Sequence, residues 1–349
     1  MSDGTKIEWA DATVNAINGC SVVSPGCTNC YAMRLAGTRL RHHPSRAGLT
    51  IDTKAGPVWN GKVRLNEDRL MQPFRWKRPR RIFWNAHGDT FHDAVPDEWI
   101  DRIFAICALT PQHTHMILTK RSARMREYLC TRGGDWMIRW PDANPPGSLP
   151  ISRHEQRLAM RGKGWPDAIP RPTFPLPNVW LGVSAEDQTR ADERIPDLLA
   201  TPAAVRFISA EPLLEPIDLR RWLPPSDETI LADTCDDCGD RHYGRCDEAA
   251  IDLVIVGGEG GPDARPMHPE AARSIRDQCA ASGTAFFFKQ WGEWAPIDEH
   301  TPDGVPITFL LPNGDRCIHA NAATTPMVRV GKKNAGRLLD GRTHDEWPA

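Results

Sequence analysis

Long apolar segments are absent from this chain. It has no apolar run of about 18 residues, the length that marks a membrane-spanning helix, and Met1–Glu8 lacks the apolar core of a secretory signal. We therefore expect a cytoplasmic protein without a membrane partner. In a reducing cytoplasm, its ten cysteines are better interpreted as metal ligands or buried thiols than as disulfides.

A strong net charge is also absent, because 43 basic and 45 acidic residues leave a formal charge of −2. This balance argues against attraction of the whole molecule to nucleic acid, but it is compatible with a local basic patch. Two stretches are locally basic, Arg34–Arg46 and Arg75–Arg81, and Trp76 lies within the second. Basic side chains interleaved with tryptophan can bind phosphates and stack on bases. A solvated surface is the alternative for each stretch.

A repeat of fixed period and a low-complexity tract are absent as well. Instead, short apolar segments alternate with segments of helical periodicity. The apolar segments cover residues 13–19, 82–86, 115–119, 179–183, 205–209, 253–256 and 285–289. This alternation is typical of a parallel sheet with crossover helices, whose strands are covered on both faces. We expect an α/β fold.

Polar residues follow directly after these expected strands. They are Cys20, Asp89, Lys120, Ser184, Glu186, Glu211, Glu259 and Lys289. In parallel α/β folds, the functional site lies at the carboxyl ends of the strands. We therefore expect the site among these residues.

Two segments interrupt the alternation, and the chain ends in a less regular one. Residues 131–177 are rich in proline, and residues 232–249 form an acidic insert with cysteines and a histidine. We expect a main domain over residues 1–292 that contains both inserts. Residues 293–349 would form an irregular extension with a β-hairpin at Pro312-Asn313-Gly314-Asp315.

Three cysteines, Cys20, Cys27 and Cys30, follow the first expected strand with six and then two residues between them. Thiolates are soft ligands that select zinc, copper or iron–sulfur clusters. Three of them leave a tetrahedral or cubane site one ligand short. Either a distant residue completes a zinc site, or a [4Fe–4S] cluster keeps one iron for a substrate or cofactor. The position after the first strand favours the cluster.

A second group of ligands lies in the acidic insert. It consists of Cys235, Cys238, His242 and Cys246, with spacing close to that of a zinc knuckle. A short loop without its own core needs a stabilising link, which structural Zn²⁺ supplies. We expect zinc here, with an auxiliary iron–sulfur cluster or idle thiols as the alternatives.

The cysteine loop, with Cys30-Tyr31-Ala32 and the order of strands and helices, resembles the radical S-adenosylmethionine superfamily, although the first cysteine interval is longer than usual. Cys27-Thr28-Asn29-Cys30-Tyr31-Ala32 resembles the spore photoproduct lyase branch. Over most of the chain, short phrases resemble a phage-associated three-Cys-motif family that is classed as radical-SAM-like. These phrases are Lys6-Ile7-Glu8-Trp9, Thr119-Lys120-Arg121, Gly182-Val183-Ser184, Val256-Gly257-Gly258-Glu259, Phe288-Lys289-Gln290-Trp291-Gly292 and Gly331-Lys332-Lys333.

The resemblance implies a partial (βα)6-type barrel and a mechanism. A [4Fe–4S] cluster on the three cysteines would cleave S-adenosylmethionine, and the 5′-deoxyadenosyl radical would abstract hydrogen from a substrate. The substrate is unidentified; nucleic acid or a nucleobase, in DNA repair or base modification, is our hypothesis. The partners implied are a three-Cys-motif partner protein and an electron donor such as flavodoxin or ferredoxin. The alternative function is a zinc-stabilised nucleic-acid-binding protein without redox chemistry.

The resemblance also implies cofactor contacts. Gly88 and Asp89 would contact the methionine amino group, and Ser184 and Glu186 would hold its carboxylate and the ribose. Helix capping is the alternative role for Asp89 and Ser184.

A glycine-rich turn follows the strand at residues 253–256. Gly257, Gly258 and Glu259 would let the backbone approach adenine or substrate. Further candidates for substrate contact are Lys120, Arg121, Glu211 and Lys289. For each of these four, a solvated or structurally paired charge is the alternative.

Overall fold

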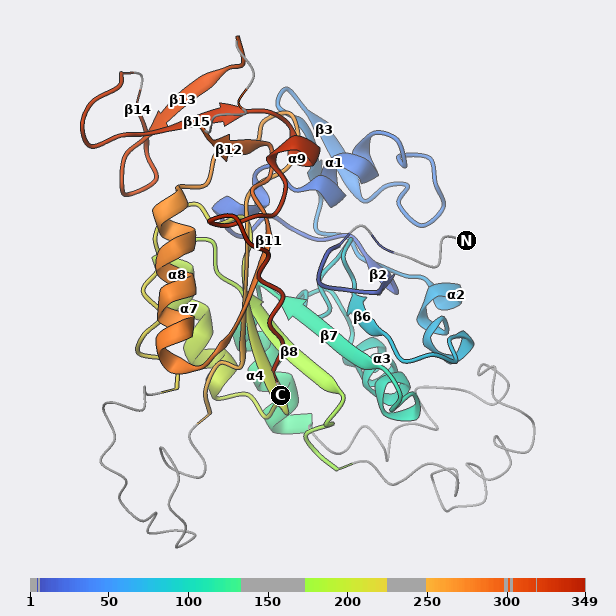
Figure 1. Cartoon of the computed structure of the whole chain (residues 1–349). Coiled ribbons are helices and arrows are strands. Elements are labelled where there is room, and N and C mark those ends of the chain that lie inside the picture. The colour runs from blue at the N-terminus through green and yellow to red at the C-terminus, as the bar shows by residue number, and fades with distance from the viewer. Residues whose placement is uncertain are drawn as a thin grey trace, which may run out of the picture. The chain divides into compact units, whose positions relative to one another are not determined.

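The apolar segments of the sequence form the strands of one sheet. In the computed structural model its strand order is β1-β6-β7-β8-β9-β10-β11. Figure 1 labels β6, β7, β8 and β11 of this sheet. The bounds are β1 Ala12–Val14, β6 Arg81–Trp84, β7 Thr114–Thr119, β8 Val179–Ser184, β9 Val205–Ala210, β10 Leu253–Gly257 and β11 Ala285–Gln290. The ladders β1-β6, β6-β7, β9-β10 and β10-β11 are parallel. The prediction of an α/β fold with parallel strands is confirmed.

The structure describes residues 5, 7–132, 173–224, 249–297, 301, 304–317 and 319–348. Most of the proline-rich segment and nearly all of the acidic insert lie outside these ranges. The four expected zinc ligands Cys235, Cys238, His242 and Cys246 therefore also lie outside the described residues. Within the described ranges, no pairing joins β11 to β1, so the sheet is open and compatible with a partial barrel. No helix in them has the length and apolarity needed to cross a membrane.

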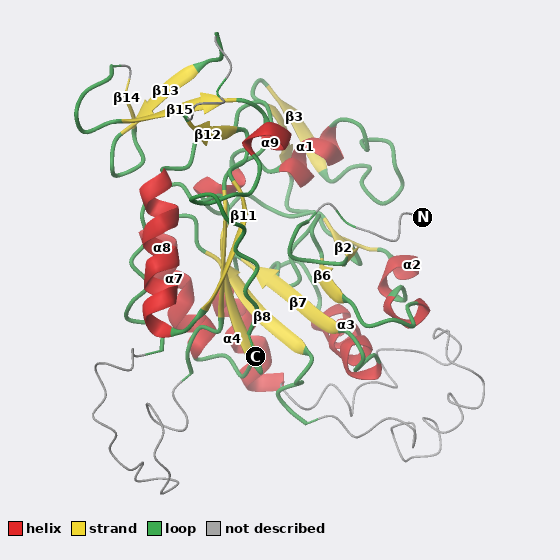
Figure 2. Cartoon of the chain, viewed as in Figure 1, coloured by secondary structure: helices red, strands yellow, loops and turns green. Residues whose placement is uncertain are grey.

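The helices follow the strands along the chain, as Figure 2 shows in red. They are α1 Tyr31–Gly37, α2 Glu67–Leu70, α3 Asp97–Leu109, α4 Ser122–Arg132, α7 Gln188–Leu199, α8 Pro269–Ser282 and α9 Lys332–Ala335. The sequence sets the ends of α8 locally. Pro269 occupies its first turn, the His268 side chain accepts from the backbone N–H of Glu270, and Gly283 ends the helix at φ 70°. Helix α8 packs beside β11.

The chain divides into two compact units. Unit 1 comprises residues 1–23, 32–182 and 201–205, and unit 2 comprises residues 24–31, 183–200 and 206–349. The division falls within β8, between Gly182 and Val183. Each unit is described by itself below.

Unit 1 contains β6 and β7, and a buried polar pair links the two strands. Trp84 and His115 are both fully buried, and Nε1 of Trp84 donates to Nδ1 of His115 at 3.0 Å. Burial, with a smaller contribution from the neighbouring His113, lowers the pKa of His115 to about 3. His115 is therefore neutral at physiological pH. Two short antiparallel pairs complete the strands of unit 1: β2 (Ile17–Asn18) with β5 (Arg64–Leu65), and β3 (Thr50–Thr53) with β4 (Gly56–Trp59).

Unit 2 contains the C-terminal segment, which is more regular than we expected. It forms a four-stranded antiparallel sheet in the order β12-β15-β13-β14. The bounds are β12 Trp294–Pro296, β13 Ile307–Leu310, β14 Arg316–Cys317 and β15 Thr325–Arg329. Its core consists of Ala264, Trp294, Leu310 and Met327. The antiparallel pair β13-β14 spans the turn at which we expected a hairpin. Strands β12 and β15 were not predicted, because they are short and partly exposed.

The turn after β10 requires glycine for packing. A Cβ at Gly258 would lie 1.9 Å from the backbone oxygen of Trp291, which cannot move without moving the chain. Gly260, two residues later, has nothing within 4 Å of its Cβ position. The two glycines therefore differ in packing within the same turn.

We expect Gly258→Ala to lower the free energy of unfolding by about 1–3 kcal/mol, because the added methyl group overpacks against backbone. Gly260→Ala is the matched control and should change stability by less than about 0.5 kcal/mol. Denaturant unfolding of both variants measures the difference. Equal stability of the two variants would contradict the close backbone contact.

Candidate functional site

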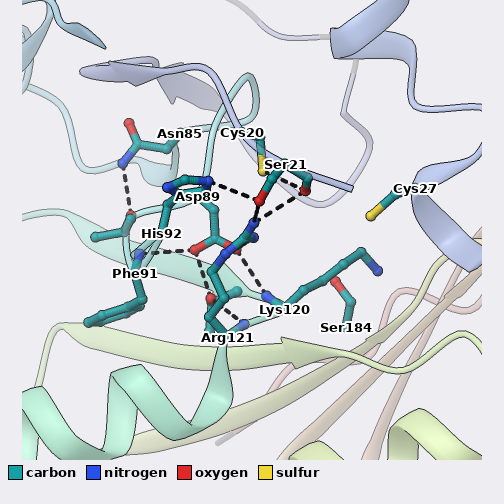
Figure 3. A network of polar contacts seen from close by, with 12 residues as sticks. Cys20, Ser21, Cys27, Asn85, Asp89, Phe91, His92, Lys120, Arg121 and Ser184 are labelled. Atoms are coloured by element: carbon teal, nitrogen blue, oxygen red, sulfur yellow. Dashed lines mark hydrogen bonds and ion pairs between the residues drawn. The ribbon is translucent and has the colours of Figure 1, made fainter. Parts of the chain in front are cut away.

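In unit 1, Asp89 follows the turn after β6 and is almost fully buried. Its Oδ1 accepts from the Phe91 amide at 2.9 Å and from the Thr119 hydroxyl at 2.7 Å. Its Oδ2 accepts from the Lys120 amide at 3.1 Å and from Nη1 of Arg121 at 2.9 Å. Figure 3 shows these contacts converging on the carboxylate. With four donors, Asp89 ties the turn after β6 to the end of β7.

Arg121 extends this network to the cysteine loop. Its Nη2 donates to the backbone oxygen of Ser21 at 3.2 Å and to the Ser21 hydroxyl at 2.8 Å. Burial alone would lower the pKa of Arg121, but Asp89 and the Cys20 thiol outweigh burial, so its pKa is raised. A fixed positive charge therefore lies beside Cys20.

The hydroxyl of Ser21 has a defined orientation. Nδ1 of His92 accepts from the Ala94 amide at 3.1 Å, and burial, followed by the Arg121 charge, lowers the pKa of His92. The neutral ring therefore carries its proton on Nε2 and donates to Ser21 Oγ, 3.0 Å away. Since that oxygen also accepts from Arg121, neither of these two contacts uses the Ser21 hydroxyl proton.

Glycine lets the backbone place Cys20 next to this network. Gly19 pairs with Gly88 in a parallel bridge. Gly19 has φ +96°, and a Cβ there would lie 2.1 Å from the backbone oxygen of Lys62. Gly88, which we expected at the cofactor, therefore pairs with the residue that precedes Cys20 and helps to position the Cys20 backbone.

In unit 2, Cys27 and Cys30 lie on the loop that contains the 3₁₀ turn η1 (Pro25–Cys27). A buried carboxylate anchors this loop, because the Gly26 amide donates to Oε1 of Glu186 at 3.0 Å. Glu186 is fully buried, and its Oε2 pairs with the buried Arg194 at 3.1 Å. Both oxygens of Glu186 are thus engaged by protein.

A second carboxylate, Glu259, anchors the same loop from the turn after β10. Nδ2 of Asn29 donates to its Oε2 at 2.9 Å, and Arg265 donates to both oxygens, with the shortest distance 2.6 Å. Arg265 also donates to the backbone oxygen of Pro25 at 3.0 Å. Burial opposes the charge of Glu259, but Arg265 and Asn29 lower its pKa, so it is ionised at neutral pH.

The other strand ends of unit 2 hold a second ion pair. Nζ of Lys289 lies 2.7 Å from Oε1 of Glu211, and the Ser209 hydroxyl donates to Oε2 at 3.0 Å. A Cβ at Gly257 would lie 2.8 Å from the Glu211 carboxylate, so the turn passes close to this pair. Ser184 is buried at the end of β8, and its backbone oxygen accepts from Arg194.

Sequence reasoning missed several residues of these networks, among them Ser21, Asn29, Arg194 and Arg265. Ser21 and Asn29 lie inside the cysteine loop, and that position was the available signal. Arg194 lies inside a helix and Arg265 in a loop, where an arginine is ordinarily a solvated charge. Their partners become visible only in the folded chain.

The cysteines of the loop are in the thiol state. The seven cysteines that the structure describes form no disulfide, and Cys20, Cys27 and Cys30 are all partly exposed. Within the described part of the chain, no three or more His, Cys, Asp or Glu side chains group closely enough to hold a metal ion. Cys20 belongs to unit 1, and the other two belong to unit 2. As a donor set, three cysteine thiols suit a soft metal or an iron–sulfur cluster.

Comparison with known proteins identifies a family but not an activity. The family model described as "Protein of unknown function (DUF5131)" matches residues 4–348. No curated protein and no solved structure matches the chain. The chain therefore belongs to the DUF5131 family.

We expect Glu186→Gln to lower the free energy of unfolding by about 3 kcal/mol, because Arg194 would keep an uncompensated charge in the interior. The control is Glu193→Gln, which removes an exposed carboxylate from the same helix as Arg194. Urea unfolding measures both. A loss no larger than that of the control would contradict the buried pairing.

We expect Arg121→Gln to slow alkylation of Cys20 at neutral pH roughly tenfold, because the thiolate loses its neighbouring positive charge. Peptide mapping after timed iodoacetamide treatment measures each cysteine separately. Cys130, exposed in α4, is the internal control and should react at an unchanged rate. Equal rates at Cys20 in both proteins would refute the electrostatic coupling.

Proposed function

We propose that this member of the DUF5131 family is a radical S-adenosylmethionine enzyme in which Cys20, Cys27 and Cys30 bind a [4Fe–4S] cluster. One observation carries the proposal. The loop of Cys27 and Cys30 is anchored through its backbone and Asn29 by two buried carboxylates, whereas the cysteines form no disulfide and are partly exposed. Such an arrangement presents soft ligands on a fixed loop, as a metal cluster requires.

The protein's part is to bind and orient its cofactors. When bound, the cluster and S-adenosylmethionine would supply a 5′-deoxyadenosyl radical that abstracts hydrogen from the substrate. Cys20 would bind iron beside the Arg121 guanidinium, which holds positive charge near the anionic thiolate. The Ser21 hydroxyl would donate to an anionic acceptor, such as the carboxylate of S-adenosylmethionine.

Three acidic residues that we expected at the cofactor have a positioning role in this proposal. In each of Asp89, Glu186 and Glu259, both carboxylate oxygens accept a hydrogen bond from, or form an ion pair with, another group of the protein. They would hold the loop and the strand ends in position, while Ser21 and Arg121 would contact the cofactor directly. The partial (βα)6-type barrel of the radical-SAM superfamily is part of the same proposal, and the open parallel sheet supports it.

The substrate class that we propose is nucleic acid or a nucleobase. The resemblance to the phage-associated three-Cys-motif family and the two basic stretches support it. An electron donor such as flavodoxin or ferredoxin would reduce the cluster, and a three-Cys-motif partner protein would accompany the enzyme. As a separate part of the proposal, a structural Zn²⁺ would be bound by Cys235, Cys238, His242 and Cys246.

Anaerobic reconstitution with iron and sulfide tests the cluster. We expect a broad visible absorbance that bleaches on reduction, and 5′-deoxyadenosine on addition of S-adenosylmethionine and reductant. Cys20→Ala, Cys27→Ala and Cys30→Ala should each lose the 5′-deoxyadenosine product, whereas the exposed Cys130→Ala should keep it. Uptake of zinc without iron and sulfide would contradict the proposal.

The zinc-stabilised nucleic-acid-binding protein gives a different pattern in the same experiment. It predicts zinc uptake without sulfide, and salt-dependent nucleic-acid binding that survives Cys27→Ala as long as the protein folds. Metal and sulfide analysis of anaerobically purified protein therefore separates the two functions.

A further inference from the structure

Unit 1 contains a cavity of about 590 Å³ that lies outside the network around Asp89. The two basic stretches of the sequence meet there. His43 and Arg46 line it from the first stretch, and Trp76 lines it from the second. Neither stretch alone distinguished a binding site from a solvated surface, but a shared cavity gives them a common location.

Asn18, on β2, lines the same cavity. Its side chain is fully buried, and neither Oδ1 nor Nδ2 has a hydrogen-bond partner among the described residues. A buried amide without partners destabilises the protein. An unpaired donor and acceptor at a cavity wall therefore indicate a ligand that supplies the missing partners.

The charges around the cavity favour an anionic ligand. Arg46 donates to Nδ1 of His87, and burial together with the Arg46 charge lowers the pKa of His87 to about 4. His87 is thus neutral and leaves the positive charge of Arg46 in place. Of the carboxylates at the cavity, Glu67 is paired with Arg102 at 2.7 Å, and Asp68 is exposed to solvent.

We infer that this cavity binds a nucleobase of single-stranded nucleic acid. The Asn18 amide would pair with a base edge that offers an adjacent donor and acceptor, as side-chain amides do with adenine. Trp76, with Arg80 over its ring at 5.0 Å, would stack on the base. Arg46 and His43 would contact phosphate. An inorganic anion would use the basic groups but would leave the amide and the indole without a role.

The inference deepens the proposed function by naming a binding site for its substrate class, and it rests on that function for the choice of nucleic acid. Binding requires no cluster and no S-adenosylmethionine. It is therefore measured on the full chain without reductant, and its failure is separable from a failure to form 5′-deoxyadenosine.

The experiment titrates labelled single-stranded DNA and RNA homo-oligonucleotides with the full chain and follows fluorescence anisotropy. Asn18→Leu should weaken binding roughly 5- to 150-fold, the range of one amide–base pairing, and should leave the melting temperature unchanged or higher because it removes an unpaired buried amide. Trp76→Ala should weaken binding by a similar factor, and Trp76→Phe should restore most of it. Competition by nucleoside monophosphates against oligonucleotides distinguishes a free nucleotide from a strand.

Arg342→Ala is the matched control, since it removes an exposed positive charge from unit 2. It should bind as the unmodified protein does. Binding that is insensitive to Asn18→Leu and Trp76→Ala, or equal binding of heparin, would overturn the inference and leave a water-filled cavity beside a basic surface. Should Asn18→Leu fail to fold, the comparison of Trp76→Ala with Trp76→Phe decides.

Discussion

The buried contact of Glu186 with Arg194 and the Gly26 amide is the constraint on which the cysteine loop depends. A carboxylate removed from water is stable only when a charge and hydrogen bonds compensate it. Here the compensation comes partly from the backbone of the loop, so burying the charge also fixes the loop. Glu259 repeats this arrangement with Asn29 on the same loop. The same buried contacts therefore stabilise the fold and fix the position of the loop that carries the two thiols.

This arrangement changes which groups are available for chemistry. Acidic residues at strand ends are ordinarily candidates for contact with a bound cofactor, yet here their oxygens are occupied by protein. Among the described residues, the thiols of the cysteine loop and the Ser21 hydroxyl proton are not used by these carboxylates, and Arg121 adds a positive charge. Within unit 1, the Cys20 thiol beside the Arg121 guanidinium favours an anionic ligand over general acid–base chemistry by carboxylates.

Much of the fold could be predicted because its signals are local. The apolar run at 253–256 became β10, and Pro269 and Gly283 bracket α8 through backbone preferences that act within a turn. In the C-terminal sheet, the hairpin of β13 and β14 was expected from its turn sequence. Strands β12 and β15 were not predicted, because they are short and partly exposed, so side-chain periodicity is weak. Asp89, Glu186 and Glu259 were correctly expected at strand ends. Their partners were not, since Gly26 and Glu186 are 160 residues apart in sequence.

The alternation of strands and helices, the cysteine loop and the two basic stretches could all be recognised from composition and from spacing along the chain. The folded chain was needed to show which carboxylates anchor the cysteine loop. It was also needed to show that Asn18 and Trp76 line the same cavity. The physical reason is that hydrogen bonding and burial depend on which distant segments meet. An asparagine at position 18 is unremarkable in the sequence, and it becomes informative only as a buried amide without a partner among the described residues.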